Sequence, residues 1–133
     1  MSDDDVARED VDREFEQAVQ MLDDARKAHE VGISKSTVVN RLYYCCFHAA
    51  QAALYARGFD PQSHGAVQTL LGRELIKPGV VEREHGRFLN DVETYRRRAD
   101  YGSGTVDRDA DELVRRTSAF LDAMRSVAGD ASE

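Results

Sequence analysis

Apolar residues recur at three- and four-residue spacing along most of this chain, and glycine or proline interrupts the pattern at short intervals. This spacing places the apolar side chains along one stripe of an α-helix. The pattern predicts helices over about 4–31, 34–57, 63–76, 80–99 and 105–127, and it indicates no strand. Because the connections are short, successive helices should pack as antiparallel neighbours. The sequence therefore predicts an all-α protein, an up-and-down bundle of four to five helices.

The length and the ends of the chain indicate how it is organised. Its 133 residues are enough for one domain with its own core, and no linker divides them. We expect a single domain over 1–133, with frayed ends at about 1–4 and 128–133. No apolar run approaches the roughly 20 residues that cross a bilayer. The acidic start lacks the apolar stretch of a secretory signal, so we expect a cytoplasmic protein with no membrane partner.

The charge of the chain limits its partners. The net charge is -7, which argues against a general coat for nucleic acid, because phosphate binding needs a positive field. Nothing in the sequence points to DNA, although a local basic site remains open. Lysine occurs only at Lys27, Lys35 and Lys77. An acidic, lysine-poor surface suits a salt-rich cytoplasm, and a halophilic source is our hypothesis.

The second predicted helix carries polar side chains along one face. Arg41, Tyr44, His48, Gln51 and Tyr55 fall within about 80° of arc on a helix of 100° per residue. The other residues of this helix are mostly apolar or small, so most of the helix should be buried. Buried polar groups need partners, or they serve a function.

The fourth predicted helix ends in an arginine run, Arg96–Arg98, followed by Asp100 and Tyr101. Cations at a helix C-terminus are stabilised by the helix dipole, which accounts for one or two of these arginines. The dipole does not account for Asp100, which needs a cationic partner there. Arg96 lies four residues before Asp100 and could pair with it on the same face.

A second partner for Asp100 is available in the second helix. A buried arginine in a bundle commonly pairs with a carboxylate of another helix. We expect an ion pair between Arg41 and Asp100 that ties the second helix to the end of the fourth. With Tyr44 and His48, these residues would form a buried polar seam.

The two cysteines, Cys45 and Cys46, are adjacent and cannot close a normal disulfide within a helix. Cys45 and His48 could share a face, but two ligands without a further cluster make a poor zinc site. Small core-filling side chains are the favoured interpretation. No metal and no cofactor is expected.

Three segments together resemble the HEPN family of small helical-bundle domains, which occur in prokaryotic toxin–antitoxin and defence systems. Residues Arg41–Ala50 resemble the branch that reads Arg-x-Tyr-Tyr-x-x-Phe-His-Ala-Ala. Residues Gly58–His64 resemble its following turn, in which a histidine opens the next helix. Residues Arg96–Tyr101 look like its closing Arg-x-x-Ala-Asp-Tyr motif. The order and spacing of all three make the resemblance specific.

The resemblance implies a metal-independent ribonuclease site in many members, built from an arginine and a histidine four to six residues later. The arginine would hold the scissile phosphate, and the histidine would move a proton. No histidine follows Arg96–Arg98 at that distance, and Asp100 stands near its place. Ribonuclease activity would therefore need Arg96 together with a relocated histidine, either His48 or His64.

The family also implies partners. Its members form dimers, and some pair with a small nucleotidyltransferase antitoxin that can modify a tyrosine near the motif; Tyr101 stands in a comparable place. The leading interpretation is a homodimeric toxin-like or partner component that binds RNA or a nucleotide phosphate at Arg96, Arg97, Arg98, Asp100 and Tyr101. The alternatives are a non-catalytic protein-binding module and a ribonuclease with a relocated histidine.

Overall fold

The computed structural model describes residues 3–101 and 108–132, with side chains over 7–101 and 108–129. The described residues form α1 (Asp3–Glu30), α2 (Lys35–Ala56), α3 (His64–Leu70), the π-helix η1 (Leu71–Ile76), α4 (Arg83–Asp100) and α5 (Ala110–Ser132). None of these described elements is a strand, and the predicted all-α bundle is confirmed.

Local sequence signals account for the ends of the first helices. Gly32 and Gly58 follow α1 and α2 with φ of 77° and 89°, a left-handed conformation that glycine adopts without strain. The Ser34 side chain accepts a hydrogen bond from the Thr37 amide and caps α2. The Ser63 hydroxyl accepts one from the Ala66 amide at 3.0 Å, so α3 begins at His64.

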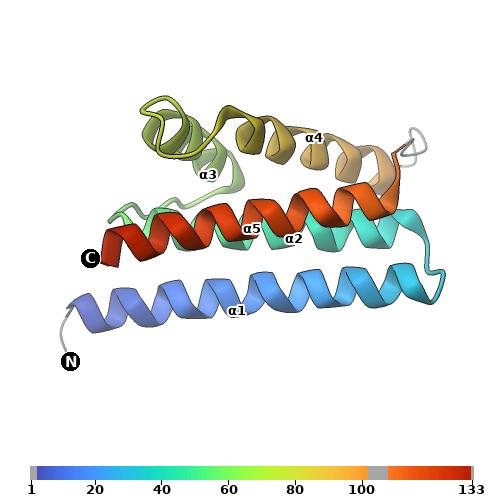
Figure 1. The fold of residues 1–133 in the computed structure, drawn as a ribbon, viewed down its shortest axis with the longest axis horizontal. Coiled ribbons are helices and arrows are strands. Elements are labelled where there is room, and N and C mark those ends of the chain that lie inside the picture. Colours follow the sequence, from blue (N-terminus) through green and yellow to red (C-terminus); the bar gives the residue numbers. More distant parts are fainter. Residues whose placement is uncertain (1–2, 102–107, 133) are drawn as a thin grey trace.

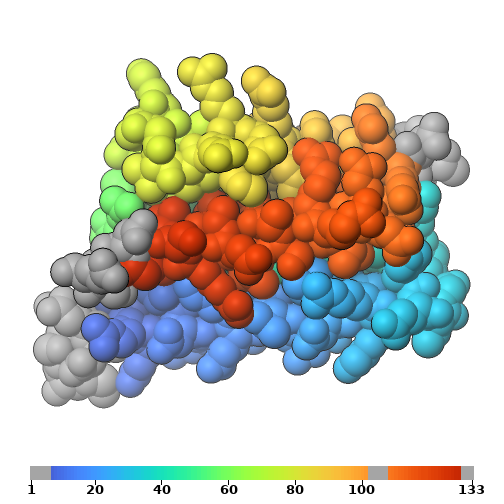
Figure 2. Space-filling model, in the orientation of Figure 1, coloured from blue at the N-terminus to red at the C-terminus, as the bar shows by residue number. Residues whose placement is uncertain are grey.

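The helices form three layers (Figure 1). Helix α1 lies on one side, α2 and α5 lie in the middle, and α3 and α4 cover the opposite side. Helix α2 contacts α1, α3, α4 and α5. In the space-filling view α5 covers the middle of the molecule between α1 and the α3–α4 layer (Figure 2). The segment that carries the first motif is therefore at the centre of the bundle.

Burial follows the predicted stripes closely. In α2 the small or apolar residues are almost entirely enclosed, which fits its central position. Each other helix contributes a row of apolar side chains to the same core. Among the largest fully buried side chains are Leu42, Tyr43, Leu54, Leu71, Phe88, Leu113, Phe120 and Met124.

The helices differ from the sequence prediction at three places, one of which is the start of the fourth helix, at Arg83 and not at about 80. The third predicted helix splits, because after Leu70 the chain continues as η1. The last helix runs to Ser132, so the described part of the expected C-terminal frayed end is helical, as are Asp3 and Asp4 in α1. The expected start of the last helix at 105–107 lies outside the described residues, among which it begins at Ala110.

No helix in the described ranges is long and apolar enough to cross a membrane. Among these same residues, no group of three or more His, Cys, Asp and Glu side chains is arranged to hold a metal ion.

Candidate functional site

Tyr43 is the centre of a polar and aromatic cluster between α2, α3 and α4. Its side chain is 2% exposed. Its hydroxyl lies 2.7 Å from Nδ1 of His64, and the Arg96 guanidinium carbon lies 4.6 Å from its ring centroid. A single tyrosine ring therefore separates an imidazole from a guanidinium that are 32 positions apart in the sequence. Burial, supported by the charge of Glu93 and opposed by Arg96, raises the pKa of Tyr43 to about 12.

Aromatic contacts hold His64 at the N-terminus of α3. The Phe47 ring stacks on the imidazole with 4.2 Å between centroids, and Tyr44 meets its edge. The residue as a whole is exposed. Because Tyr43 occupies Nδ1, Nε2 is the ring nitrogen that remains available to a ligand.

Arg96 is placed by two neighbours. Its Nη1 donates to Asp100 Oδ2 at 2.9 Å, and its face lies over the Tyr43 ring. The predicted pairing of Arg96 with Asp100 is confirmed. The buried Nε atom of Arg96 has no hydrogen-bond partner among the described residues.

A buried carboxylate neutralises the next arginine. Glu93 is 9% exposed; it accepts a hydrogen bond from the Gln68 amide and another from Arg97 Nη2 at 2.6 Å. Both partners satisfy a charge that would be costly to bury alone. The ion pair with Glu93 therefore lowers the positive charge that Arg97 presents to an anion.

Arg98 differs from Arg96 and Arg97. It is exposed and makes no ion pair with the side chains described over 7–101 and 108–129. Tyr101, which is 81% exposed, follows the helix end. Among the described side chains, the arginine run therefore has one guanidinium without an ion pair, three residues before an exposed aromatic residue, and its other two arginines are held by carboxylates.

The expected ion pair between Arg41 and Asp100 is wrong. Arg41 directs Nη1 to the Met21 sulfur of α1 at 3.5 Å, whereas Asp100 pairs with Arg96 on its own helix. Helix α4 lies on the opposite side of α2 from α1, so a side chain directed at α1 does not reach Asp100 (Figure 1). The predicted seam is divided between two faces of α2.

His48 lies on the face of α2 that packs against α1. Its Nδ1 lies 2.6 Å from Glu14 Oε2, and both side chains are mostly buried. The structure therefore brings His64, and not His48, next to the tyrosine that contacts Arg96. The Tyr44 ring meets the Tyr43 ring in a T-shaped arrangement, with 5.0 Å between centroids.

Replacing Glu14 by alanine should lower the free energy of unfolding by about 1 kcal/mol, because His48 loses its hydrogen-bond partner in a half-buried place. Urea denaturation would measure the loss. Glu16→Ala is the matched control: this exposed carboxylate of α1 should change stability by less than about 0.5 kcal/mol. Equal losses in the two variants would contradict the role assigned to the Glu14–His48 contact.

The cysteines are buried, as expected for core-filling residues. Burial raises the pKa of the Cys45 thiol to about 12 and that of Cys46 well above its ordinary value. Thiols held protonated in this way are poor nucleophiles at neutral pH.

The sequence interpretation missed Tyr43, Gln68 and Glu93. A signal existed for Glu93, which stands four residues before Arg97 and so shares its helical face. Tyr43 lies beside the recognised stripe in the same motif, and only the packing of α3 and α4 shows that it contacts His64 and Arg96. Gln68 carries no local signal.

Comparison with known proteins identifies the family of this chain. The HEPN domain model matches residues 11–127, which include all three motifs. A UPF0332 protein of Thermotoga maritima is 32% identical over 96 residues, covering 71% of this chain and 73% of the relative. Two proteins of Methanocaldococcus jannaschii, each named “Putative toxin”, are 26% identical over 121 residues and 29% identical over 86 residues. The first alignment covers 90% of both chains, and the second covers 62% of this chain and 58% of the relative.

The helical architecture, the three motifs in their order and the family match agree with one another. The chain belongs to the HEPN domain family.

Proposed function

We propose that this HEPN protein is the toxin-like component of a two-component system and that it binds RNA at the C-terminal end of α4. The single observation that carries the RNA-binding proposal is that Arg98, which has no ion pair among the described side chains, and Tyr101 are both exposed at the end of α4 in a chain of net charge -7. A guanidinium attracts a phosphate, and an exposed ring offers a stacking surface to a base. The toxin names of the two archaeal relatives support the toxin-like role.

The proposed assembly follows from the family and not from a contact in this chain. A homodimer would place two α4 ends close together, and a small nucleotidyltransferase would act as the cytoplasmic partner. Tyr101 is the tyrosine most open to such a partner near the motif, since four fifths of it is exposed.

A second candidate function, a metal-independent ribonuclease, is favoured by the position of His64. The family's usual histidine is absent, but Tyr43 links the His64 imidazole to Arg96. In this reaction His64 would take the proton of a ribose 2′-hydroxyl while the 2′-oxygen forms a bond to the neighbouring phosphorus. The bond from phosphorus to the 5′-oxygen would break, and that oxygen would leave with a proton from water. Arg96 would stabilise the charge on the phosphate.

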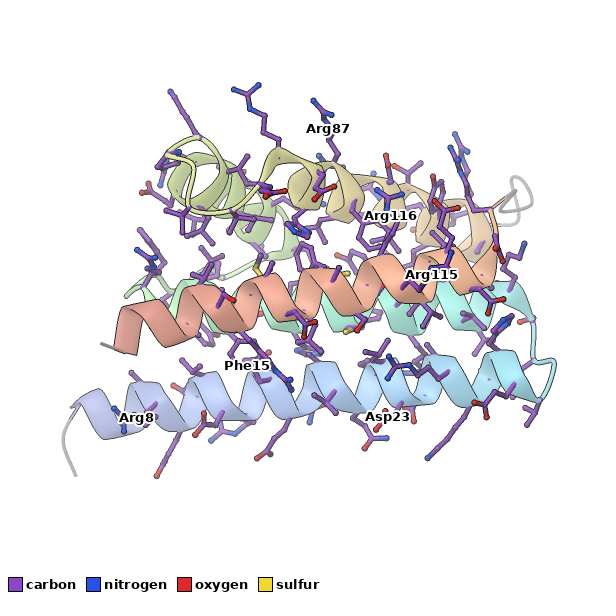
Figure 3. The ribbon with its side chains drawn as sticks, in the orientation of Figure 1. Arg8, Phe15, Asp23, Arg87, Arg115 and Arg116 are labelled. Carbon is purple, nitrogen blue, oxygen red and sulfur yellow. The ribbon has the colours of Figure 1, made fainter. Side chains whose placement is uncertain are left out.

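The two candidates separate in one experiment on the purified full chain. The first measurement is retention of a labelled single-stranded RNA, and the second is its cleavage in the presence of a chelator. The variants are Arg98→Ala, His64→Asn and His48→Asn, with Arg8→Ala as a control. Arg8 is exposed on α1, far from α4 (Figure 3).

We expect Arg98→Ala to weaken RNA retention about tenfold while Arg8→Ala changes it less than twofold. A ribonuclease of the second type would lose cleavage in His64→Asn and keep it in His48→Asn. Retention without cleavage leaves the binding function alone. Neither retention nor cleavage would leave a non-catalytic protein-binding module, and the RNA proposal would be abandoned.

A further inference from the structure

A groove with a volume of about 400 Å³ lies between α1 and α5, away from the layer that contains α4. Five of its lining residues come from α1 and one from α5; they are Asp12, Phe15, Glu16, Val19, Gln20 and Arg125. Figure 2 shows the two helices side by side on one face of the molecule, and Figure 3 labels Phe15 between their ribbons. The groove therefore lies on a face that α1 and α5 form together.

The floor of the groove is apolar. Phe15 and Val19 pack against the hydrophobic core, yet both remain partly exposed. They are four residues apart, so they lie on the same face of α1, one turn apart. The partly exposed aromatic ring gives an incoming side chain a flat apolar surface to pack on.

The rim of the groove carries charges of both signs. Asp12 and Glu16 belong to α1, Arg125 belongs to α5, and all three are exposed. None of them makes an ion pair with the side chains described over 7–101 and 108–129. The two carboxylates are four residues apart, a spacing at which like charges repel each other on a helix. A cation from a partner would relieve this repulsion.

The acidic side of the rim suits an arginine side chain. Asp12 and Glu16 lie before and after Phe15 along α1, so two carboxylates flank one aromatic ring. A guanidinium is planar, donates in a fork to carboxylates and stacks on aromatic rings. The aliphatic part of the same side chain covers apolar surface such as the floor of this groove.

The groove also supplies an arginine, which makes its charges complementary to themselves. A two-fold axis through the groove would bring Arg125 of one copy to the two carboxylates of a second copy, and the same contact would form in the other direction. A uniformly basic partner would be repelled by Arg125, and a uniformly acidic partner by Asp12 and Glu16. Charge complementarity therefore favours a second copy of this chain.

The face around the groove is large enough for such a contact. Helix α1 has 28 residues and α5 has 23, so they extend about 42 Å and about 35 Å. Two neighbouring helices, each about 10 Å wide, offer on the order of 700 Å² over the shorter length. This area is close to the roughly 800 Å² that each partner contributes to a standard interface.

We propose that two copies of this chain dock through the α1–α5 groove. Arg125 of each copy lies over Phe15 of the other, and its guanidinium pairs with the two carboxylates of that copy's rim. This contact does not rest on the proposed function, because α4 lies on the opposite side of α2 from α1 and its end stays open (Figure 1). If two α4 ends also pair, the assembly contains at least four chains.

Charge reversal tests the exchange of arginines. The first test variant carries Asp12→Arg and Glu16→Arg, and the second carries Arg125→Glu. In a pair of identical variants, like charges meet in both halves of the contact. In a mixture of the two variants, opposite charges meet in both halves, because the introduced arginines face the introduced glutamate and the unchanged groups face each other.

Control variants change the charge by the same amounts on the α4 layer. Glu82→Arg with Asp91→Arg matches the first test variant, and Arg87→Glu matches the second. All three residues are exposed and none of them lines the groove. Sedimentation velocity at low ionic strength would measure association, after thermal unfolding has shown that each variant folds.

We expect each test variant to weaken association about tenfold or more, whereas the controls should change it less than about twofold. An equimolar mixture of the two test variants should restore association to within about threefold of the unmodified chain. Association that neither test variant weakens would overturn the groove contact, whatever RNA retention shows. A mixture that associates as weakly as its two components would overturn the exchange of arginines. A single-chain mass for the unmodified chain up to roughly 1 mM would overturn the contact as well.

Discussion

Replacing Tyr43 by alanine should lower the free energy of unfolding by about 3–5 kcal/mol, the usual cost of deleting a buried aromatic ring. The ring supports three neighbours at once, because Phe47, His64 and Arg96 all contact it. Domains of this size are stable by only about 5–15 kcal/mol, so the variant should be close to unfolding at room temperature. Urea denaturation followed by circular dichroism would measure the loss.

Tyr43→Phe is the matched variant. It keeps the ring under Arg96 and loses only the hydrogen bond to His64, so it should cost about 1 kcal/mol. If the cluster serves RNA cleavage, this variant should also lose activity, because Nδ1 of His64 is no longer held. Similar losses of stability in the two variants would contradict the packing role, since the hydroxyl and not the ring would then matter most.

The helices of this fold were predictable from sequence because each buries one apolar stripe, and a period of 3.6 residues is visible without knowledge of the neighbours. The predicted range 34–57 agrees closely with α2, because Ser34 caps its start and Gly58 follows its end. The π-helical turn was not predictable in this way: its residues, Leu71–Ile76, continue an ordinary apolar pattern.

The candidate site was predictable only in part. The motif at Arg96–Tyr101 was identified, and spacing alone predicted the pairing of Arg96 with Asp100. The partner of Arg41 was not, because it depends on which side of α2 each neighbouring helix occupies. The sequence showed that this helix is enclosed, but it contained no information on whether Arg41 meets α1 or α4.

The unpaired arginines show a similar limit. From sequence, only the arginine run Arg96–Arg98 was singled out as a basic segment, and no prediction was made for Arg83 or Arg87. Ion pairs reduce the positive charge that this run presents, because Glu93 and Asp100 hold two of its three arginines. Arg83 and Arg87, in the first half of α4, are exposed and make no ion pair with the side chains described over 7–101 and 108–129, a distribution that depends on side-chain contacts.

Alkaline pH should destabilise the protein well before its arginines lose charge. Burial raises the pKa of Tyr43 from 10.0 to about 12 and that of Cys45 from 9.0 to about 12. Between the ordinary and the raised values the unfolded chain has released these protons while the folded chain still holds them. The unfolded state then binds fewer protons, so stability falls as pH rises.

The size of this effect follows from about 1.4 kcal/mol for each unit of pKa shift. Between pH 8 and pH 11.5 the fall should be about 2 kcal/mol from Tyr43 and about 3 kcal/mol from Cys45, with a further contribution of the same sign from Cys46. Urea denaturation at the two pH values, under reducing conditions, would measure it. Below about pH 8 stability should depend little on these groups, because they are then almost fully protonated in both states.

Variants assign the fall to individual groups. Tyr43→Phe should be less stable than the unmodified chain at pH 8, yet its stability should fall about 2 kcal/mol less between the two pH values. Cys45→Ala should remove the larger contribution, about 3 kcal/mol, in the same comparison. Loss of charge on Lys27, Lys35 and Lys77 is common to all of these proteins and cancels in the difference. An identical fall in Tyr43→Phe and in the unmodified chain would mean that the folded protein ionises this phenol as readily as the unfolded chain does. The buried hydrogen bond between Tyr43 and His64 would then not hold the phenol in its protonated form.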